Sequence, residues 1–185
     1  MPRGYGEVVF SLVQMRLASY NIVTDTFGTA VELPEAQTLE FSFETDTDAI
    51  KAGGYLQHLL AVTTHATLNL SSAGVPFEAL AILSGASNNS SGTPPNRTRR
   101  LNVGAGGSGL PYFGVVGKLV GEQGDDLHVG LPVCKLDGVP SWKAEQNKFV
   151  IASAEGRAIK RASGHLVYLL GHETAANVDF NEIFA

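Results

Sequence analysis

The stretch Thr38-Leu39-Glu40-Phe41-Ser42-Phe43-Glu44-Thr45-Asp46 alternates between apolar and polar side chains. Because successive side chains of a β-strand point to opposite faces, this period of two predicts a half-buried strand. The segment His65-Ala66-Thr67-Leu68-Asn69-Leu70-Ser71 alternates in the same way. We therefore expect two long antiparallel strands with one apolar and one polar face. A polar connection over residues 47–54 and the apolar run Tyr55–Val62 would join them.

The polar face of this predicted hairpin is acidic. Glu40, Glu44 and Asp46 lie on it, Asp48 follows just beyond, and neither alternating segment contains Lys or Arg. A row of carboxylates on a strand is ordinarily a solvated sheet face. The alternative is that the row lines the inside of a tube.

The composition limits the classes of protein that the chain can belong to. With 185 residues, 44% of them hydrophobic, the chain can bury one core, so a single domain over residues 1–185 is expected. The formal net charge of -5 argues against a protein that clamps nucleic acid. The single cysteine, Cys134, excludes an intramolecular disulfide and a cysteine-based metal site.

The sequence shows no targeting or membrane segment. The start of the chain lacks the pattern of a signal peptide, and no apolar run approaches the ~20 residues that span a bilayer. We expect a soluble protein, synthesised in the cytoplasm, that does not insert into membranes. Residues 1–6 are expected to form an N-terminal arm.

The rest of the chain is expected to consist of strands around one helix. The helix is predicted between Pro76 at its first position and Gly85 just past its end. Residues 86–109 are polar and glycine-rich, and we interpret them as a long loop with a short strand at 98–103, with an interdomain linker as the alternative. The other expected strands cover residues 7–18, 30–33, 112–120, 127–135, 148–154 and 166–170. Short strands with one helix indicate a β-sandwich or barrel.

The chemical motifs in the sequence are weak. Residues 104–109 match G-x-G-x-x-G, but a predicted strand follows where a dinucleotide site needs a helix. Asp126 and His128 share a strand face and offer two metal ligands, yet a carboxylate at a hairpin end and a surface histidine explain the spacing better. We therefore predict no catalytic residues, no metal site and no cofactor, and a protein that is not an enzyme.

Two features indicate contacts with other chains. Arg97, Arg99 and Arg100 form the one basic cluster, which is either a solvated loop or a docking point for acidic groups of a neighbouring subunit. The C-terminal segment, residues 177–185, has Phe180 and Phe184 in an otherwise irregular stretch, which indicates an arm that docks onto another surface. These five residues are the candidates for inter-subunit contact.

The succession of these segments resembles the major tail proteins, or tail tube proteins, of long-tailed, non-contractile phages. The resemblance extends from about Glu7 to Ala175 and depends on the order of short segments. These segments are Leu33–Leu39 before the acidic strand, Leu83-Ser84-Gly85, Ser91–Asn96, Pro111-Tyr112-Phe113, Gly124–His128, and the strand with Lys135.

The resemblance implies a mainly β fold, a β-sandwich or barrel with one flanking helix, in which six copies close into a ring and rings stack into a tube. A long hairpin from each copy would contribute to an inner β-barrel, with Glu40, Glu44, Asp46 and Asp48 facing the lumen. Double-stranded DNA would pass through without specific binding, because an acidic wall repels phosphates.

The resemblance also implies partners and a location. The partners would be further copies of the chain and the tail terminator, tail tip and tape measure proteins, and the location would be the virion tail. The tube of a contractile tail or of a secretion machine is an alternative in the same class. A monomeric small-ligand-binding β-barrel is the alternative from a different class, and an enzyme, which would need clustered titratable groups, comes third.

Overall fold

The structure is a computed structural model, which describes residues 10–52, 55–74, 76–103, 109–121, 125–143, 151–162, 164–172 and 176–185. In this part of the chain the protein is mainly β, as the sequence predicted, and its sheets are antiparallel and do not close into a barrel. This part contains two helices where one was expected, because the C-terminal segment also forms a short helix. The expected N-terminal arm, residues 1–6, and the glycine loop 104–108 lie outside the described residues.

The main sheet contains ten strands. Seven follow one hydrogen-bonded path in the order β2-β1-β8-β9-β11-β5-β4. Of the other three, β3 pairs with β1, β12 with β9 and β10 with β11. Their bounds are β1 Phe10–Asn21, β2 Thr26–Phe27, β3 Val31–Leu33, β4 Ala36–Ala52, β5 Tyr55–Ser72, β8 Phe113–Gly121, β9 Asp126–Leu136, β10 Ser141–Lys143, β11 Ile151–Ile159 and β12 Tyr168–His172. The expected strands are confirmed with shifted ends where they are described, whereas β2 and β10 were not predicted.

The core lies where the β4–β5 end of the sheet packs across β1 and β8. A Cβ placed on Gly117 of β8 would meet Leu39 Cδ2 of β4 at 2.5 Å, so a glycine is needed for this close approach. The fully buried side chains include Met15 and Leu17 from β1 and Phe113 and Val115 from β8. The apolar face that the alternation at residues 38–46 predicted is therefore the face that covers the core.

Helix α1, Phe77–Ser84, covers one end of this core. Ala79 and Leu83 are buried, and Gly85 ends the helix in the left-handed conformation at φ 69°, as its position predicted. Pro76 differs slightly from the expectation. It lies just before the helix and not in its first position, because its backbone is extended, with φ -67° and ψ 151°.

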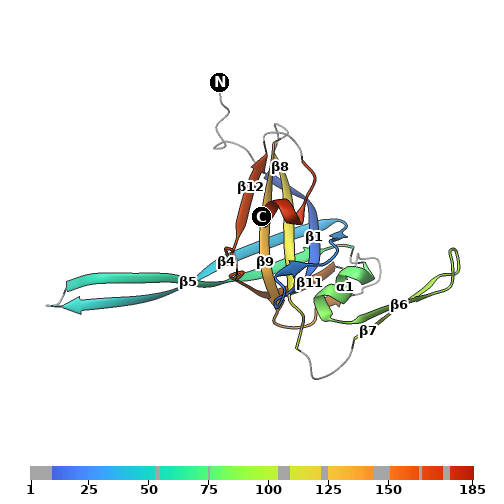
Figure 1. Cartoon of the computed structure of the whole chain (residues 1–185), viewed down its shortest axis with the longest axis horizontal. Coiled ribbons are helices and arrows are strands. Elements are labelled where there is room, and N and C mark those ends of the chain that lie inside the picture. The colour runs from blue at the N-terminus through green and yellow to red at the C-terminus, as the bar shows by residue number, and fades with distance from the viewer. Residues whose placement is uncertain are drawn as a thin grey trace.

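Two hairpins project from this body toward opposite ends of the long axis of the molecule (Figure 1). One is the long β4–β5 hairpin, and the other is formed by β6, Ser87–Ser91, and β7, Thr98–Asn102. The second helix, α2, Phe180–Ile183, lies on the outer face of the sheet near β12 (Figure 1).

Candidate assembly surfaces

Only part of the β4–β5 hairpin pairs with the rest of the sheet. β4 has 17 residues and β5 has 18, but β5 pairs with β11 only over Ala66–Ser72. Beyond that point the two strands pair only with each other in the described part of the chain. We call this part, residues 44–52 and 55–65, the free half; at about 3.3 Å per residue it extends about 30 Å from the body.

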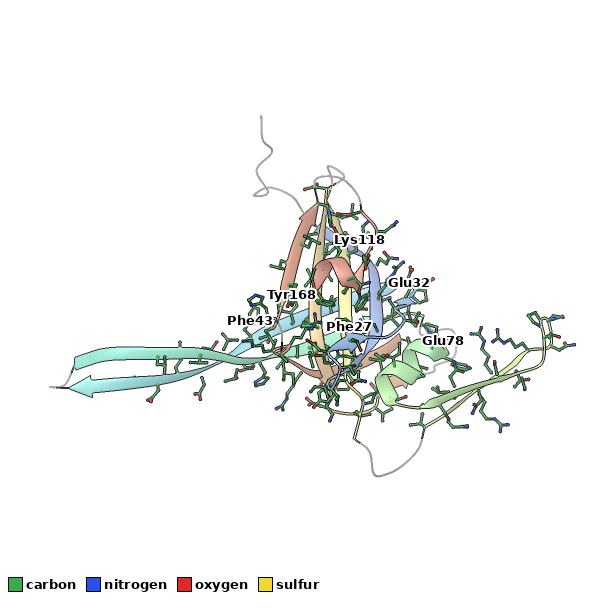
Figure 2. All side chains as sticks on the ribbon, in the orientation of Figure 1. Phe27, Glu32, Phe43, Glu78, Lys118 and Tyr168 are labelled. Atoms are coloured by element: carbon green, nitrogen blue, oxygen red, sulfur yellow. The ribbon has the colours of Figure 1, made fainter. Side chains whose placement is uncertain are left out.

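The free half and its root expose large apolar side chains. Phe43 is 55% exposed, Leu60 62% and Val62 50%. Figure 2 shows Phe43 where the hairpin leaves the body. An isolated two-stranded ribbon is marginally stable in water, and its unpaired edges are templates for further strands. The unpaired edges of the ribbon, together with Phe43 exposed at its root, therefore indicate a surface that another chain covers.

The four acidic residues predicted to share one face do so. Glu40, Glu44, Asp46 and Asp48 occupy alternate positions of β4, and all four are exposed. The predicted connection at residues 47–54 is wrong in length, because residues up to Ala52 belong to β4, which includes Lys51 near its end. The hairpin is consequently longer than the alternation alone indicated.

The acidic face is not polar along its whole length, which corrects the expectation of one wet face. Glu44 lies opposite His65, but Thr45 lies opposite Thr63, so Thr64 is an extra residue in β5. A β-bulge of this kind shifts the alternation of one strand against the other. The shift places Val62 opposite Asp46 and Leu60 opposite Asp48. Carboxylates and apolar side chains therefore alternate across the free half.

The acidic face continues onto the body as a shallow groove of about 270 Å³. Glu40 and Glu155 lie on either side of Asn69 in adjacent strands, and Asp137 lines the same groove. Arg157 is close to Asp137, with 3.5 Å between Nε and Oδ1, and both side chains are well exposed. The groove on the body thus has side chains of both signs of charge, whereas the charged residues on the same face of the free half are acidic.

The predicted long loop at 86–109 contains a second hairpin, which corrects the expectation of a single short strand. Ser87–Ser91 pairs with Thr98–Asn102. Arg97 donates from Nη2 to Ser90 Oγ at 3.1 Å, and Arg99 forms an ion pair with Glu78 of α1 at 3.1 Å between Nη1 and Oε1. Arg100 lies opposite Asn89 and is exposed. The structure therefore brings the three arginines together on one projecting arm.

The C-terminal aromatic residues occupy a different place from the one expected. Phe180 and Phe184 are 7% and 5% exposed, and they pack with Phe27, Tyr168 and Val116 on the outer face of the chain's own sheet. Burying an aromatic side chain stabilises by about 1.5–3 kcal/mol, which explains why the segment docks on its own sheet. This corrects their assignment as inter-subunit contacts.

Asp126 and His128 also differ from the expectation. His128 is 1% exposed, so it is not a surface histidine, and Asp126 is buried beside it. His172, which sequence spacing did not connect to either residue, joins them because β12 pairs with β9. Among the described residues this is the one group of three potential metal-ligating side chains.

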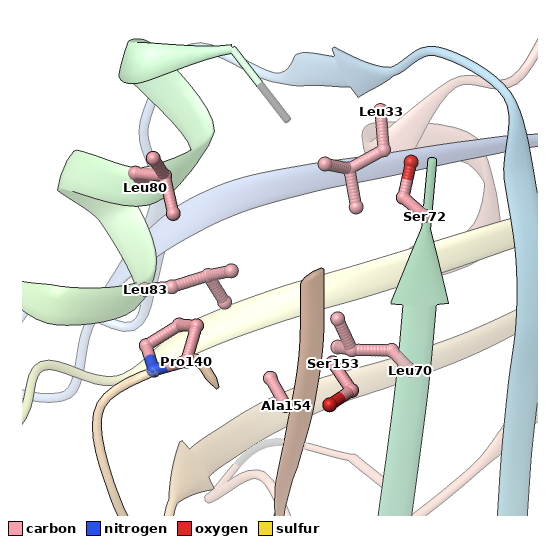
Figure 3. A pocket seen from close by; sticks show the side chains of 8 residues that line it. All are labelled: Leu33, Leu70, Ser72, Leu80, Leu83, Pro140, Ser153 and Ala154. Carbon is pink, nitrogen blue, oxygen red and sulfur yellow. The ribbon is translucent and has the colours of Figure 1, made fainter. Parts of the chain in front are cut away.

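The pocket beneath α1 is too small for a ligand. The pocket beneath α1, lined by residues such as Leu33, Leu80 and Leu83, holds about 10 Å³ (Figure 3). That volume corresponds to about one water molecule. With a sheet that does not close, the described part of the chain lacks the interior that a ligand-binding barrel requires.

No protein-family model matches the sequence, and no curated protein matches it. None of the described helices is long and apolar enough to cross a membrane.

Proposed function

We propose that the protein is the structural subunit of a phage tail tube, in which copies of the chain form rings and the rings stack into a conduit for DNA. The observation that carries the proposal is the free half of the β4–β5 hairpin. It extends about 30 Å from the body, pairs with no further strand among the described residues, and exposes Leu60 and Val62.

The two edges of the hairpin supply a means of association. β4 is the last strand of the sheet, and the outer edge of β5 is unpaired along the free half. The β4 edge of one copy can hydrogen-bond to the β5 edge of the next. This contact joins two different surfaces, so it is head-to-tail and closes into a ring when the rotation per copy divides a full turn. The joined hairpins would then form an inner barrel without free edges.

The acidic face fits the lumen of such a barrel. Glu44, Asp46 and Asp48 lie on one side of the free half with Val62 and Leu60 between them. Neither carboxylates nor aliphatic side chains bind phosphate, and a repeated ring of carboxylates repels it. DNA would therefore slide past this wall. Tail terminator, tail tip and tape measure proteins would be the partners at the tube's ends and within it, in the virion tail.

The β6–β7 arm supports a second contact. Arg97 and Arg100 are exposed at the opposite end of the molecule from the acidic hairpin (Figure 1). An arm with cationic side chains is suited to reach acidic groups of a neighbouring copy, and such steering depends on salt. We assign this arm to contacts between copies.

Electron microscopy of the purified protein tests the proposal. The full chain should form rings or tubes in negative stain as its concentration rises, because closure follows mass action. The matched variant replaces residues 46–62 with an Asn-Gly turn between Thr45 and Thr63, which are opposite each other. It should remain folded and stay a monomer. A full chain that stays a monodisperse 19.5 kDa particle, or a shortened chain that still forms tubes, would contradict the proposal.

A further inference from the structure

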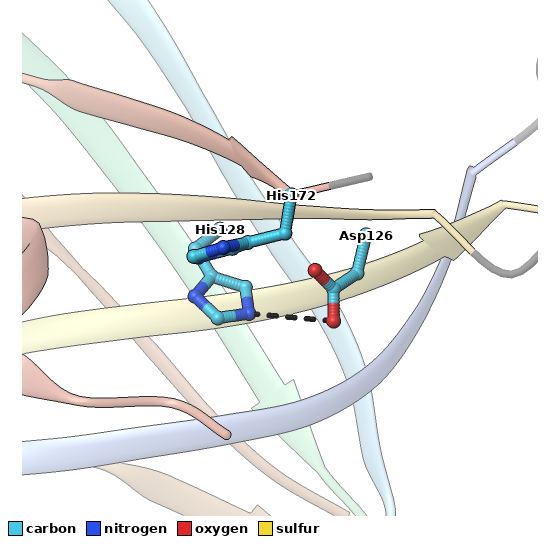
Figure 4. Close-up of side chains that lie close together, drawn as sticks. All are labelled: Asp126, His128 and His172. Atoms are coloured by element: carbon cyan, nitrogen blue, oxygen red, sulfur yellow. Dashed lines mark ion pairs between the residues drawn. The ribbon is translucent and has the colours of Figure 1, made fainter. Parts of the chain in front are cut away.

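Three side chains that can ligate metal meet on the outer face of the sheet, away from both hairpins. Asp126 and His128 occupy alternate positions of β9, and His172 of β12 lies directly opposite Asp126. Figure 4 shows the two imidazole rings and the carboxylate grouped together. Asp126 and His128 are buried, and the His172 side chain is 20% exposed.

Three polar atoms of this group lack a hydrogen-bond partner in the part of the chain that the structure describes. Asp126 Oδ1, His128 Nε2 and His172 Nε2 are all buried without a hydrogen bond among the described residues. One ligand atom from each residue lies within 4.8 Å of the others, and the two imidazole centres are 4.9 Å apart. A buried polar atom without a partner costs about 1–3 kcal/mol, so three of them at one place require an explanation.

The other oxygen of Asp126 is fully engaged. Oδ2 accepts a hydrogen bond from the Ala176 backbone N–H at 2.8 Å and lies 2.9 Å from Lys118 Nζ. These contacts fix the carboxylate, and Oδ2 also lies 3.7 Å from His128 Nε2. Oδ1 has no hydrogen-bond partner among the described residues. Outer-shell contacts of this kind orient carboxylates that ligate metals. Burial raises the pKa of Asp126, but the Lys118 and Ala176 hydrogen bonds outweigh it, and the pKa is lowered overall. Burial also lowers the pKa of His128.

A fourth ligand is within reach on the C-terminal helix. Glu182 of α2 has Oε1 4.0 Å from His172 Nε2, and about half of its side chain is exposed. Asp126 and Glu182 together carry two negative charges against the single ammonium of Lys118, so the local balance favours a cation. A metal at this position would connect α2 to β9 and β12.

We propose that Asp126, His128 and His172, with Glu182 as the fourth ligand, form a structural site for a divalent transition metal, with Zn²⁺ as the preferred ion. Two imidazoles and two carboxylates are ligands that Zn²⁺ accepts in tetrahedral geometry, whereas Mg²⁺ and Ca²⁺ prefer oxygen alone. Zinc bonds of about 2.0–2.2 Å place tetrahedral ligand atoms about 3.4 Å apart. The side chains need to approach one another by about 1 Å.

Titration of the untagged, chelator-treated full chain with ZnCl₂ in a calorimeter tests the site. The wild type should bind one Zn²⁺ per chain, and its melting temperature should rise with Zn²⁺ concentration. His172→Gln and Glu182→Gln change partly exposed side chains, so both variants should fold, and each should weaken binding at least about tenfold. His165→Gln, which removes an exposed histidine outside the group, is the matched control and should bind like wild type.

Replacing Zn²⁺ by Co²⁺ provides a second readout. Co²⁺ in a tetrahedral site should give visible absorption bands in the wild type and in His165→Gln, and these bands should be lost in His172→Gln. Folded wild type that takes up no Zn²⁺ would overturn the site. Uptake that His172→Gln leaves unchanged would overturn it as well, because the metal would then be bound elsewhere.

Discussion

Single residues on the outer face of the sheet decide whether the C-terminal segment stays docked. Arg16 Nη1 donates to Val178 O at 2.9 Å, Arg161 Nη1 donates to Phe184 O at 2.8 Å, and Lys118 donates to Ala176 O. Three side chains of the body thus bind the backbone of the segment. Gly130 of β9 provides the space beneath it, because a Cβ there would lie 2.7 Å from Phe184 Cε1.

Gly130→Ala should therefore destabilise the protein. The Phe184 ring is enclosed by Phe27, Phe180 and Tyr168, so it has little room to move away from an added methyl group. Overpacking of this kind costs about 1–3 kcal/mol, which urea denaturation would detect as a lower free energy of unfolding. Gly138→Ala is the control, since an added Cβ there meets no atom within 4 Å. Equal unfolding midpoints for the two variants would contradict this account of Gly130.

A second residue-scale prediction concerns alkaline pH. Burial of Tyr20, followed by its hydrogen bond to Asp25 Oδ1 at 2.5 Å, raises the pKa of Tyr20 above its ordinary value. Above about pH 10 the unfolded chain loses this proton while the folded chain keeps it, so the free energy of unfolding falls as the pH rises. Tyr20→Phe should have a shallower decline between pH 9 and about pH 11 in urea denaturation. Parallel curves for variant and wild type would show that Tyr20 does not contribute.

At the scale of elements, the apolar surface at the root of the β4–β5 hairpin should be needed for assembly but not for folding. Phe43→Ser removes a ring that is 55% exposed and contacts Phe41 edge-on, so it should change the free energy of unfolding by only about 1 kcal/mol. It should nevertheless abolish tubes in sedimentation and negative stain. Leu169→Ser, at a position 65% exposed on β12, is the control and should assemble normally. If Phe43→Ser still formed normal tubes, this apolar surface would not be needed for assembly.

The elements differ in how far the sequence predicts them. The alternation at Leu39, Phe41 and Phe43 is local, and it predicts the strand β4 correctly. Leu39 and Phe41 pack against the core as predicted, whereas Phe43 is exposed where the hairpin leaves the body. The bulge at Thr64 depends on which residues of β5 pair with β4, and no local pattern contains that register. β6 is Ser-Asn-Asn-Ser-Ser, residues with low strand propensity, and it is extended because it pairs with β7.

The sequence likewise predicts the proposed metal site only in part. Asp126 and His128, two residues apart on one strand, are visible in the sequence as a pair on one face. His172 joins them through the β12–β9 pairing, and Glu182 through the docking of α2. Both contacts are long-range, so spacing alone indicated neither the third ligand nor the burial of His128.

At the scale of the whole molecule, the sign of the charge on the free hairpin should decide whether assembled tubes retain DNA. Glu44→Lys with Asp46→Lys should still assemble, since both residues are exposed, but its tubes should co-sediment with duplex DNA at low salt and release it at high salt. Glu32→Lys with Glu35→Lys has the same net charge and changes exposed residues on and beside β3. Equal DNA retention by the two variants would place the acidic hairpin outside the lumen.

The unpaired edge of β5 also affects how a newly synthesised copy of the chain behaves before it assembles. Before it meets a neighbour, its backbone amides and carbonyls there are bonded only to water, and any other extended chain can add to them. Mutual repulsion between the carboxylates of β4 would delay premature pairing. Counter-ions shorten the range of that repulsion to about 8 Å at physiological ionic strength. Polymerisation would thus begin sooner in concentrated salt. The ionic strength of the solution, as well as the supply of subunits, would set when growth begins.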